Sequence, residues 1–240
     1  MNQEIISLKQ KINRGDICVG AVTSVQVGFE ELKRILETGD YDYLSIDSQH
    51  AAFNEEKLVG FCQMVATLNT HVQFRIKHTR HSYLIGNMLD LGPQGIEVPQ
   101  VELVETAEES VKNFYYSKVG ARSWGGTQRF GLSSNPDRLE YSKWWNQYGV
   151  LWLQVESIYA VEKAQLLALQ GVDCLSFGPA DLTFNLEANP NYRLKNVDGC
   201  VQEVVNKLSV TDTKVCFRNY TKETRQKYID MGVTVFLERP

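Results

Sequence analysis

Eight short apolar segments rich in β-forming residues recur along the chain, and segments with helical periodicity separate them. The apolar segments are residues 17–22, 43–47, 72–76, 95–99, 150–156, 174–179, 214–218 and 233–238. Helical stretches such as 29–39, 55–69, 103–116 and 160–171 lie between them, and several close on glycine, as helices often do. This alternation predicts an α/β protein, here a (β/α)8 TIM barrel. A doubly wound open sheet shows the same alternation, so the pattern leaves that alternative open.

The length and the loops favour one domain. The chain has 240 residues, enough for one such barrel, and it contains no interdomain linker, internal repeat or low-complexity tract. We therefore expect a single domain over residues 1–240. The one long irregular segment, 115–140, is rich in Gly, Ser and Arg and separates the fourth and fifth predicted strands. Loops of that length in compact domains are usually functional or disordered.

Composition narrows the class of protein. Hydrophobic residues make up 43% and charged residues 22%, as in soluble globular proteins, and the net charge of −4 argues against a nucleic-acid-binding surface. The chain contains no apolar run near the roughly 20 residues that span a membrane, and its first residues lack a signal-peptide core. Five scattered cysteines suit reduced thiols. We expect a soluble cytoplasmic protein that binds neither nucleic acid nor membrane.

Polar residues follow several of the predicted strands. The second strand is followed by Asp47 and His50, the third ends at Arg75, the fifth ends at Glu156, and the sixth leads to Asp181. In a barrel, the carboxyl ends of the strands surround one mouth, so these side chains would converge there.

These residue types together suit one kind of chemistry. A Glu and an Asp can hold a hard divalent cation and leave coordination positions for water and substrate. An Asp near a His can orient the imidazole as a general base, and an Arg can bind a carboxylate through two hydrogen bonds. Each residue alone also has a structural reading, since an Asp or Glu after a strand often caps a helix or favours its N-terminus. The whole set predicts a site for proton abstraction next to a metal-polarised carbonyl.

Seven segments, in chain order, carry a family resemblance. They are NRGDICVGAVTS, GDYDYLSIDSQHAAFNEEKL, FRI, MLDLGPQGIEVPQV, GARSWGG, LQVES and FGPADLT. Together they resemble the HpcH/HpaI aldolase family, the metal-dependent class II aldolases that use pyruvate or a related 2-oxo acid, such as the 4-hydroxy-2-oxoheptanedioate and 2-dehydro-3-deoxyglucarate aldolases. LQVES and FGPADLT match the family's metal-binding strands and are the most specific. The resemblance extends over nearly the whole chain and implies a TIM barrel of the phosphoenolpyruvate/pyruvate type.

The resemblance also implies roles for residues at the mouth. Glu156 and Asp181 would be the ligands of a divalent metal ion, and such ligation suits Mg²⁺, Mn²⁺ or Co²⁺ about equally. The Gln154 side chain and the backbone amides of Ala180 and Asp181 would line the carboxylate and metal pocket.

The remaining implied roles concern the proton and the 2-oxo acid. His50 would be the base, directly or through a metal-bound water, with Asp47 as its partner. Arg75 would bind the 2-oxo acid and stabilise the enolate oxygen. The family's usual D-x-E-H is DSQH here, so Gln49 replaces an acid and is a possible modulator, because glutamine cannot accept a proton at neutral pH.

The resemblance implies a carbon–carbon lyase. The expected reaction is retro-aldol cleavage of a 4-hydroxy-2-oxo acid, through a metal-bound enolate, to pyruvate or a related 2-oxo acid and an aldehyde. Two alternatives stay open: a specialised non-aldol lyase or decarboxylating enzyme of a biosynthetic pathway, and a non-catalytic barrel that binds an acidic ligand. Gln49 and the basic segment KHTRH, 77–81, motivate the first, and that segment could also enlarge an anion site.

The end of the chain bears on assembly. The sequence stops at Pro240, directly after the eighth predicted strand, where the family has a further helix that packs on a neighbouring subunit. We expect exposed apolar barrel surface there, a homo-oligomer smaller than the family's hexamer, most simply a dimer, and a helix over residues 3–13 packed near the closing seam.

Overall fold

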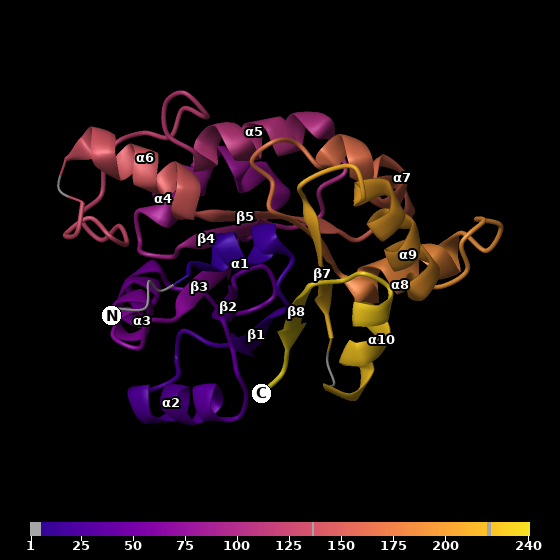
Figure 1. Cartoon of the computed structure of the whole chain (residues 1–240), viewed down its shortest axis with the longest axis horizontal. Coiled ribbons are helices and arrows are strands. Elements are labelled where there is room, and N and C mark those ends of the chain that lie inside the picture. The colour runs from indigo at the N-terminus through magenta and orange to yellow at the C-terminus, as the bar shows by residue number, and fades with distance from the viewer. Residues whose placement is uncertain (1–5, 136, 220–221) are drawn as a thin grey trace.

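The computed structural model describes residues 6–135, 137–219 and 222–240, and within them eight parallel strands form a closed barrel (Figure 1). The strands are β1 Cys18–Thr23, β2 Tyr43–Asp47, β3 His71–Arg75, β4 Gly95–Val98, β5 Val150–Val155, β6 Cys174–Phe177, β7 Lys214–Arg218 and β8 Val235–Glu238. They follow one another in chain order, and β8 pairs with β1, with Cys18 opposite Val235. This closure confirms the (β/α)8 fold and excludes the open sheet.

Helices surround the barrel, and each predicted helical stretch is helical (Figure 1). The α-helices are α1 Leu8–Arg14, α2 Phe29–Glu37, α3 Glu55–Ala66, α4 Ile85–Leu89, α5 Val104–Phe114, α6 Arg138–Tyr148, α7 Ile158–Leu167, α8 Pro179–Ala188, α9 Val197–Leu208 and α10 Arg225–Asp230, and the 3₁₀ helices are η1 Thr79–Leu84 and η2 Lys222–Thr224. Side chains of Asn54, Ser157 and Asn196 accept hydrogen bonds from the first turns of α3, α7 and α9, which fixes where these helices begin. No helix in the described residues is long and apolar enough to cross a membrane.

The described residues between Phe114 and the start of α6 at Arg138 are irregular, so the predicted irregular segment 115–140 ends three residues earlier than expected. Two buried arginines organise it. Arg122 pairs with Asp90 at 2.8 Å and lies over the Trp145 ring, and Arg129 lies 3.9 Å from the Trp124 ring centroid. These cation–π contacts hold the irregular segment against the barrel.

The barrel interior is filled with side chains at its N-terminal half. Tyr43 and Trp152 meet edge to face with ring centroids 5.2 Å apart, inside a cluster that also contains Val150 and Leu237. A Cβ atom on Gly20 would lie 2.1 Å from the Tyr43 ring, so only glycine fits there. This packing leaves the opposite, C-terminal mouth for polar side chains.

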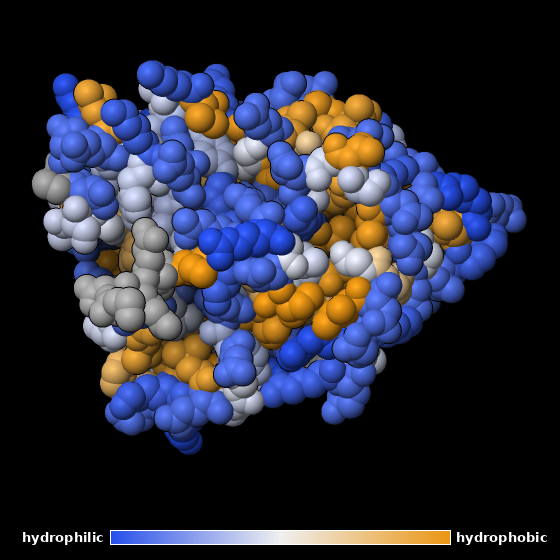
Figure 2. Space-filling model, viewed as in Figure 1, coloured by the Kyte–Doolittle hydropathy of each residue, from blue (hydrophilic) through white to orange (hydrophobic). Residues whose placement is uncertain are grey.

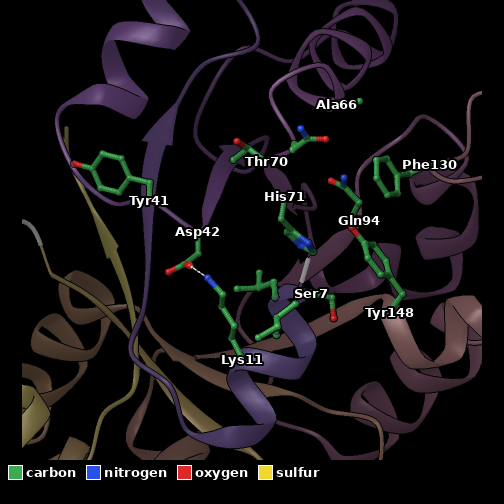
Figure 3. A pocket seen from close by; sticks show the side chains of 13 residues that line it. Ser7, Lys11, Tyr41, Asp42, Ala66, Thr70, His71, Gln94, Phe130 and Tyr148 are labelled. Carbon is green, nitrogen blue, oxygen red and sulfur yellow. Dashed lines mark hydrogen bonds and ion pairs between the residues drawn. The ribbon is translucent and has the colours of Figure 1, made fainter. Parts of the chain in front are cut away.

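Helix α1 closes the N-terminal end of the barrel. Its Leu8 and Ile12 join the interior cluster, and Lys9 binds Asp173 at 2.7 Å, just before β6. Lys11 binds Asp42, just before β2, at 2.6 Å beside a pocket of about 400 Å³ (Figure 3). The predicted N-terminal helix is therefore present, and the cluster that it joins includes Cys18 of β1 and Val235 of β8, the two strands of the closing seam. Its apolar face fits the open end of the barrel. Residues 3–5 of that prediction lie outside the described residues.

The closing seam itself is covered. Val19, Ala21 and Phe236 belong to the cluster between the sheet and the helices, and all three are buried. The apolar surface that we expected these strands to expose is therefore absent at these positions. Figure 2 shows apolar residues at the surface between α1 and α10, and Ile17, directly before β1, is 42% exposed.

Candidate active site

Asp47 and Arg75 form an ion pair at the C-terminal mouth of the barrel. They are direct partners in the parallel register of β2 and β3. Arg75 donates from Nε to Asp47 Oδ1 at 2.8 Å and from Nη2 to Oδ2 at 2.6 Å, while Nη1 donates to Gln154 Oε1 at 3.2 Å. Burial alone would raise the pKa of Asp47, but the hydrogen bonds and charge of Arg75 outweigh it and hold that pKa below its usual value. The pair fixes a buried guanidinium at the mouth.

His50 lies beyond the end of β2 with an exposed side chain. The described hydrogen bonds of Asp47 are to Arg75 and to the backbone N–H of Gln49, at 2.9 Å, and none to His50 is found among the described residues. The expected pairing of Asp47 with His50 stays a prediction, whereas the pairing of Asp47 with Arg75 was not foreseen.

Glu156 follows β5 and is only 5% exposed. Its Oε2 accepts a hydrogen bond from the backbone N–H of Gln100 at 3.0 Å. A Cβ atom on Gly178 would lie 2.2 Å from Glu156 Oε1, so the glycine at the start of α8 makes room for this carboxylate. Gln100 has a φ of 50°, in the left-handed region that non-glycine residues seldom adopt, and such strain often accompanies functional sites.

Asp181 lies in the first turn of α8, near enough to Glu156 to affect its charge. Burial first, and then the negative charge of Asp181, raise the pKa of Glu156 to about 7. Asp181 and its neighbour Ala180 are exposed, and Pro179 begins the helix. The negative charge of Asp181 opposes the ionisation of Glu156, and a cation held by both carboxylates would remove that opposition.

The donor set fits a hard divalent cation with only two protein ligands. No group of three or more His, Cys, Asp or Glu residues suited to metal binding occurs in the described part of the chain. Glu156 and Asp181 supply carboxylate oxygens, so substrate and water would supply the remaining ligands. Two buried polar atoms at the same mouth, Gln49 Oε1 and Gln154 Nε2, have no hydrogen-bond partner among the described residues. Buried polar groups of this kind normally bind a water or a ligand.

A second buried ion pair at the mouth was missed by the sequence analysis. Arg218, at the end of β7, donates from Nη2 to Glu97 Oε2 on β4 at 2.6 Å, and both side chains are buried. The sequence contained a signal for both residues. Arg218 ends the predicted strand KVCFR as Arg75 ends the third strand, and Glu97 is a charged residue within the apolar segment GIEVP. The positive charge of Arg218 contributes to the low pKa of Asp47, so the two ion pairs belong to one charged layer.

Comparison with known proteins identifies the family. The family model described as "HpcH/HpaI aldolase/citrate lyase" matches residues 29–226. A hydroxypyruvate/pyruvate aldolase of Delftia acidovorans is 29% identical over 201 residues, which are 82% of this chain and 73% of that protein.

Two solved structures are similar over almost the whole chain. The HpcH/HpaI aldolase from Desulfitobacterium hafniense has a TM-score of 0.82 at 24% identity and covers 98% of this chain and 90% of its own. Citrate synthase SbnG has a TM-score of 0.81 at 26% identity and covers 98% of this chain and 91% of its own. The chain is therefore an enzyme of the lyase class and belongs to the HpcH/HpaI aldolase/citrate lyase family.

Proposed function

We propose that this enzyme is a divalent-metal-dependent aldolase that cleaves a 4-hydroxy-2-oxo acid to pyruvate, or a related 2-oxo acid, and an aldehyde. The observation that carries the proposal is the buried carboxylate of Glu156, with its pKa raised by burial and by Asp181, at the same barrel mouth as the Arg75 guanidinium. The names of the aldolase relatives agree with it.

The roles of the chain's own residues follow from their chemistry. Arg75, held by Asp47, binds the 2-oxo acid through charged hydrogen bonds and stabilises negative charge on its C2 oxygen. His50 takes the proton of the C4 hydroxyl, the C3–C4 bond breaks, the aldehyde leaves, and the electron pair remains in the enolate of the 2-oxo acid. The protonated His50 then gives its proton to C3 of the enolate, which completes the reaction and restores the base. A bound Mg²⁺, Mn²⁺ or Co²⁺, held by Glu156 and Asp181, supplies Lewis-acid polarisation of the 2-oxo group.

A second candidate is a biosynthetic carbon–carbon lyase that generates the enolate without an aldol cleavage. The structural similarity to citrate synthase SbnG favours it, as does Gln49 in place of the family's acid. The two candidates share the enolate and differ in the second substrate.

Proton exchange tests the shared chemistry without knowledge of the aldehyde. Pyruvate in D₂O should lose its methyl proton signal in NMR when the enzyme and Mg²⁺ or Mn²⁺ are present, and excess EDTA should stop the exchange. Full exchange in EDTA would refute the metal requirement, and no exchange with Mg²⁺, Mn²⁺ or Co²⁺ would refute the proposal.

We also propose that the enzyme acts in the cytoplasm as a homo-oligomer, most simply a dimer. All five cysteines are buried free thiols, which suits a reducing compartment. Exposed apolar side chains such as Phe184 (73%) and Leu139 (65%) are candidates for subunit contacts. Sedimentation at micromolar concentration tests the assembly, and a stable hexamer would contradict the dimer.

A further inference from the structure

We infer that Arg218 is a positioning residue of the active site: it binds the Glu97 carboxylate, so that Arg75 keeps its free N–H donors for the 2-oxo acid. The inference rests on the proposed function and extends it, because it adds a residue that acts on the substrate through Arg75.

The guanidinium of Arg75 has only a few donors left for a ligand. A guanidinium carries five N–H donors. Among the described residues, Arg75 uses three of them, from Nε and Nη2 to Asp47 and from Nη1 to Gln154 Oε1. One N–H on Nη1 and one on Nη2 remain for the carboxylate of the 2-oxo acid. Any further anion beside Arg75 would compete with the substrate for these two donors.

Glu97 flanks Arg75 on the side opposite to Asp47. Arg75 is the direct register partner of Asp47 on β2 and of Glu97 on β4. Neighbouring strands lie about 4.8 Å apart, so the Glu97 carboxylate can reach the guanidinium. Glu97 is fully buried, and its Oε1 has no hydrogen-bond partner among the described residues. A buried carboxylate needs a cation, so Glu97 would bind Arg75 if no other cation were present.

Arg218 is that other cation, and it comes from across the barrel. It ends β7, three strands away from β4 in the closed barrel. Its Nη2 donates to Glu97 Oε2 at 2.6 Å, and both side chains are buried. This charge-assisted hydrogen bond holds the Glu97 carboxylate towards β7 and away from β3. In the described structure, Arg75 accordingly forms its ion pair with Asp47 and not with Glu97, although both acids are its register partners.

Removal of Arg218 tests the inference through the Kd for pyruvate, measured by calorimetry at saturating Mn²⁺. In Arg218→Leu, Glu97 loses its counterion and should bind Arg75, which takes at least one of the two free donors. The Kd for pyruvate should rise roughly ten- to a hundredfold, as expected for the loss of one hydrogen bond to a charged group. A crystal structure of this variant should show the Glu97 carboxylate within hydrogen-bond distance of Arg75.

A second substitution separates positioning from direct substrate binding. Replacement of both Glu97 and Arg218 by leucine should return the pyruvate Kd to within about threefold of the wild-type value, because no carboxylate then competes for Arg75. Arg218→Lys keeps a positive charge for Glu97 and should also bind pyruvate nearly as the wild type does. Arg218→Gln, whose amide can still donate to Glu97, is the milder variant in case Arg218→Leu does not fold, and its Kd should rise in the same direction.

Lys9→Met is the matched control for a loss of stability. It leaves the buried carboxylate of Asp173 without its cation at the opposite end of the barrel, so it should lower the free energy of unfolding but leave the pyruvate Kd unchanged.

Two results would overturn the inference. One is an unchanged pyruvate Kd in the folded leucine or glutamine variant of Arg218. The other is an equal rise in Arg218→Leu and in the double leucine variant, because Arg218 would then bind the substrate itself. A wild-type enzyme that binds no pyruvate in the presence of Mg²⁺, Mn²⁺ or Co²⁺ would instead refute the proposed function.

Discussion

Gly178→Ala is expected to weaken metal binding although Gly178 itself holds no metal. The new Cβ would lie 2.2 Å from Glu156 Oε1 and 2.8 Å from its Cδ. Side-chain Cβ atoms essentially never approach other atoms within 3.0 Å, so Oε1 must retreat by at least 0.8 Å, the difference between 3.0 and 2.2 Å. Glu156 cannot keep its present position in this variant.

The size of the effect follows from the contacts of Glu156. Loss of the hydrogen bond from the Gln100 amide to the carboxylate costs about 1.5–3 kcal/mol, because one partner is charged. An off-rotamer side chain costs about 0.5–1.5 kcal/mol more. If about 2 kcal/mol of this total is lost from the metal-bound state, the Kd for Mn²⁺ rises roughly thirtyfold.

Mn²⁺ titration followed by electron paramagnetic resonance measures that Kd directly. Gly60→Ala is the matched control, because a Cβ at this position in α3 meets nothing within 4 Å. It should leave the Mn²⁺ affinity unchanged and raise the free energy of unfolding by about 0.5–1 kcal/mol, as alanine does in a helix interior. An unchanged Mn²⁺ Kd for a folded Gly178→Ala protein would refute the assignment of Glu156 as a ligand in its present position.

Four further predictions concern the other charged and titratable residues. Arg75→Lys should raise the Kd for pyruvate, measured by calorimetry, tenfold or more, since lysine cannot form two parallel hydrogen bonds to the pyruvate carboxylate as a guanidinium can. An unchanged Kd would mean that the pyruvate carboxylate binds elsewhere. His50→Ala should abolish proton exchange into pyruvate but keep the Mn²⁺ affinity, and loss of the metal as well would make His50 a ligand. Glu97→Gln should lower the free energy of unfolding in urea by about 3–5 kcal/mol, because it leaves Arg218 buried without its counterion. Replacement of both Glu97 and Arg218 by leucine should lower it far less. Equal losses of stability in the single and the double variant would contradict this reasoning. Burial lowers the pKa of His71 from 6.5 to about 4, so the unfolded chain binds this proton first, and the contribution of His71 to stability falls by up to about 1.4 kcal/mol per pH unit from pH 6.5 towards 4. The raised pKa of Glu156 acts in the opposite direction over part of this range in both proteins. The difference in the free energy of unfolding in urea between the wild type and His71→Gln should therefore show the slope, and a difference that does not change with pH would contradict it.

Local sequence patterns were sufficient to predict the eight strands and the helices between them. The predicted segments 43–47 and 214–218 coincide with β2 and β7, and the other six differ from the observed strands by one or two residues at an end. Strand composition and helix periodicity are properties of short stretches, so they are visible without knowledge of the fold. The same alternation fits an open sheet, and only the pairing of β8 with β1 shows that the barrel is closed.

The pairings at the mouth could not be predicted in the same way. The pairing of Asp47 with His50 stays a prediction, but the pairing of Asp47 with Arg75, 28 residues away, was not foreseen and comes from the parallel register of β2 and β3. Glu97 and Arg218 are 121 residues apart and meet only because the barrel closes. Such contacts depend on strand register and barrel curvature, which short sequence patterns do not specify.

The position of α1 at the N-terminal end of the barrel could not be predicted for the same reason. Its apolar residues Leu8 and Ile12 indicated a helix with one buried face, but several surfaces of a barrel could receive it. The salt bridges of Lys9 and Lys11 to Asp173 and Asp42, each just before a strand, select the N-terminal end. These partners are recognisable only once the strands are in place.

Anomalous diffraction at the manganese edge, from crystals of the enzyme soaked with Mn²⁺ and pyruvate, tests the central claim most directly. The account predicts one Mn²⁺ peak bound by the carboxylates of Glu156 and Asp181, with the carboxylate or 2-oxo group of pyruvate within hydrogen-bond distance of Arg75. The same crystals of Glu156→Gln should show a much weaker peak or none. A fully occupied Mn²⁺ site away from both carboxylates, or pyruvate bound without contact to the metal, would contradict it.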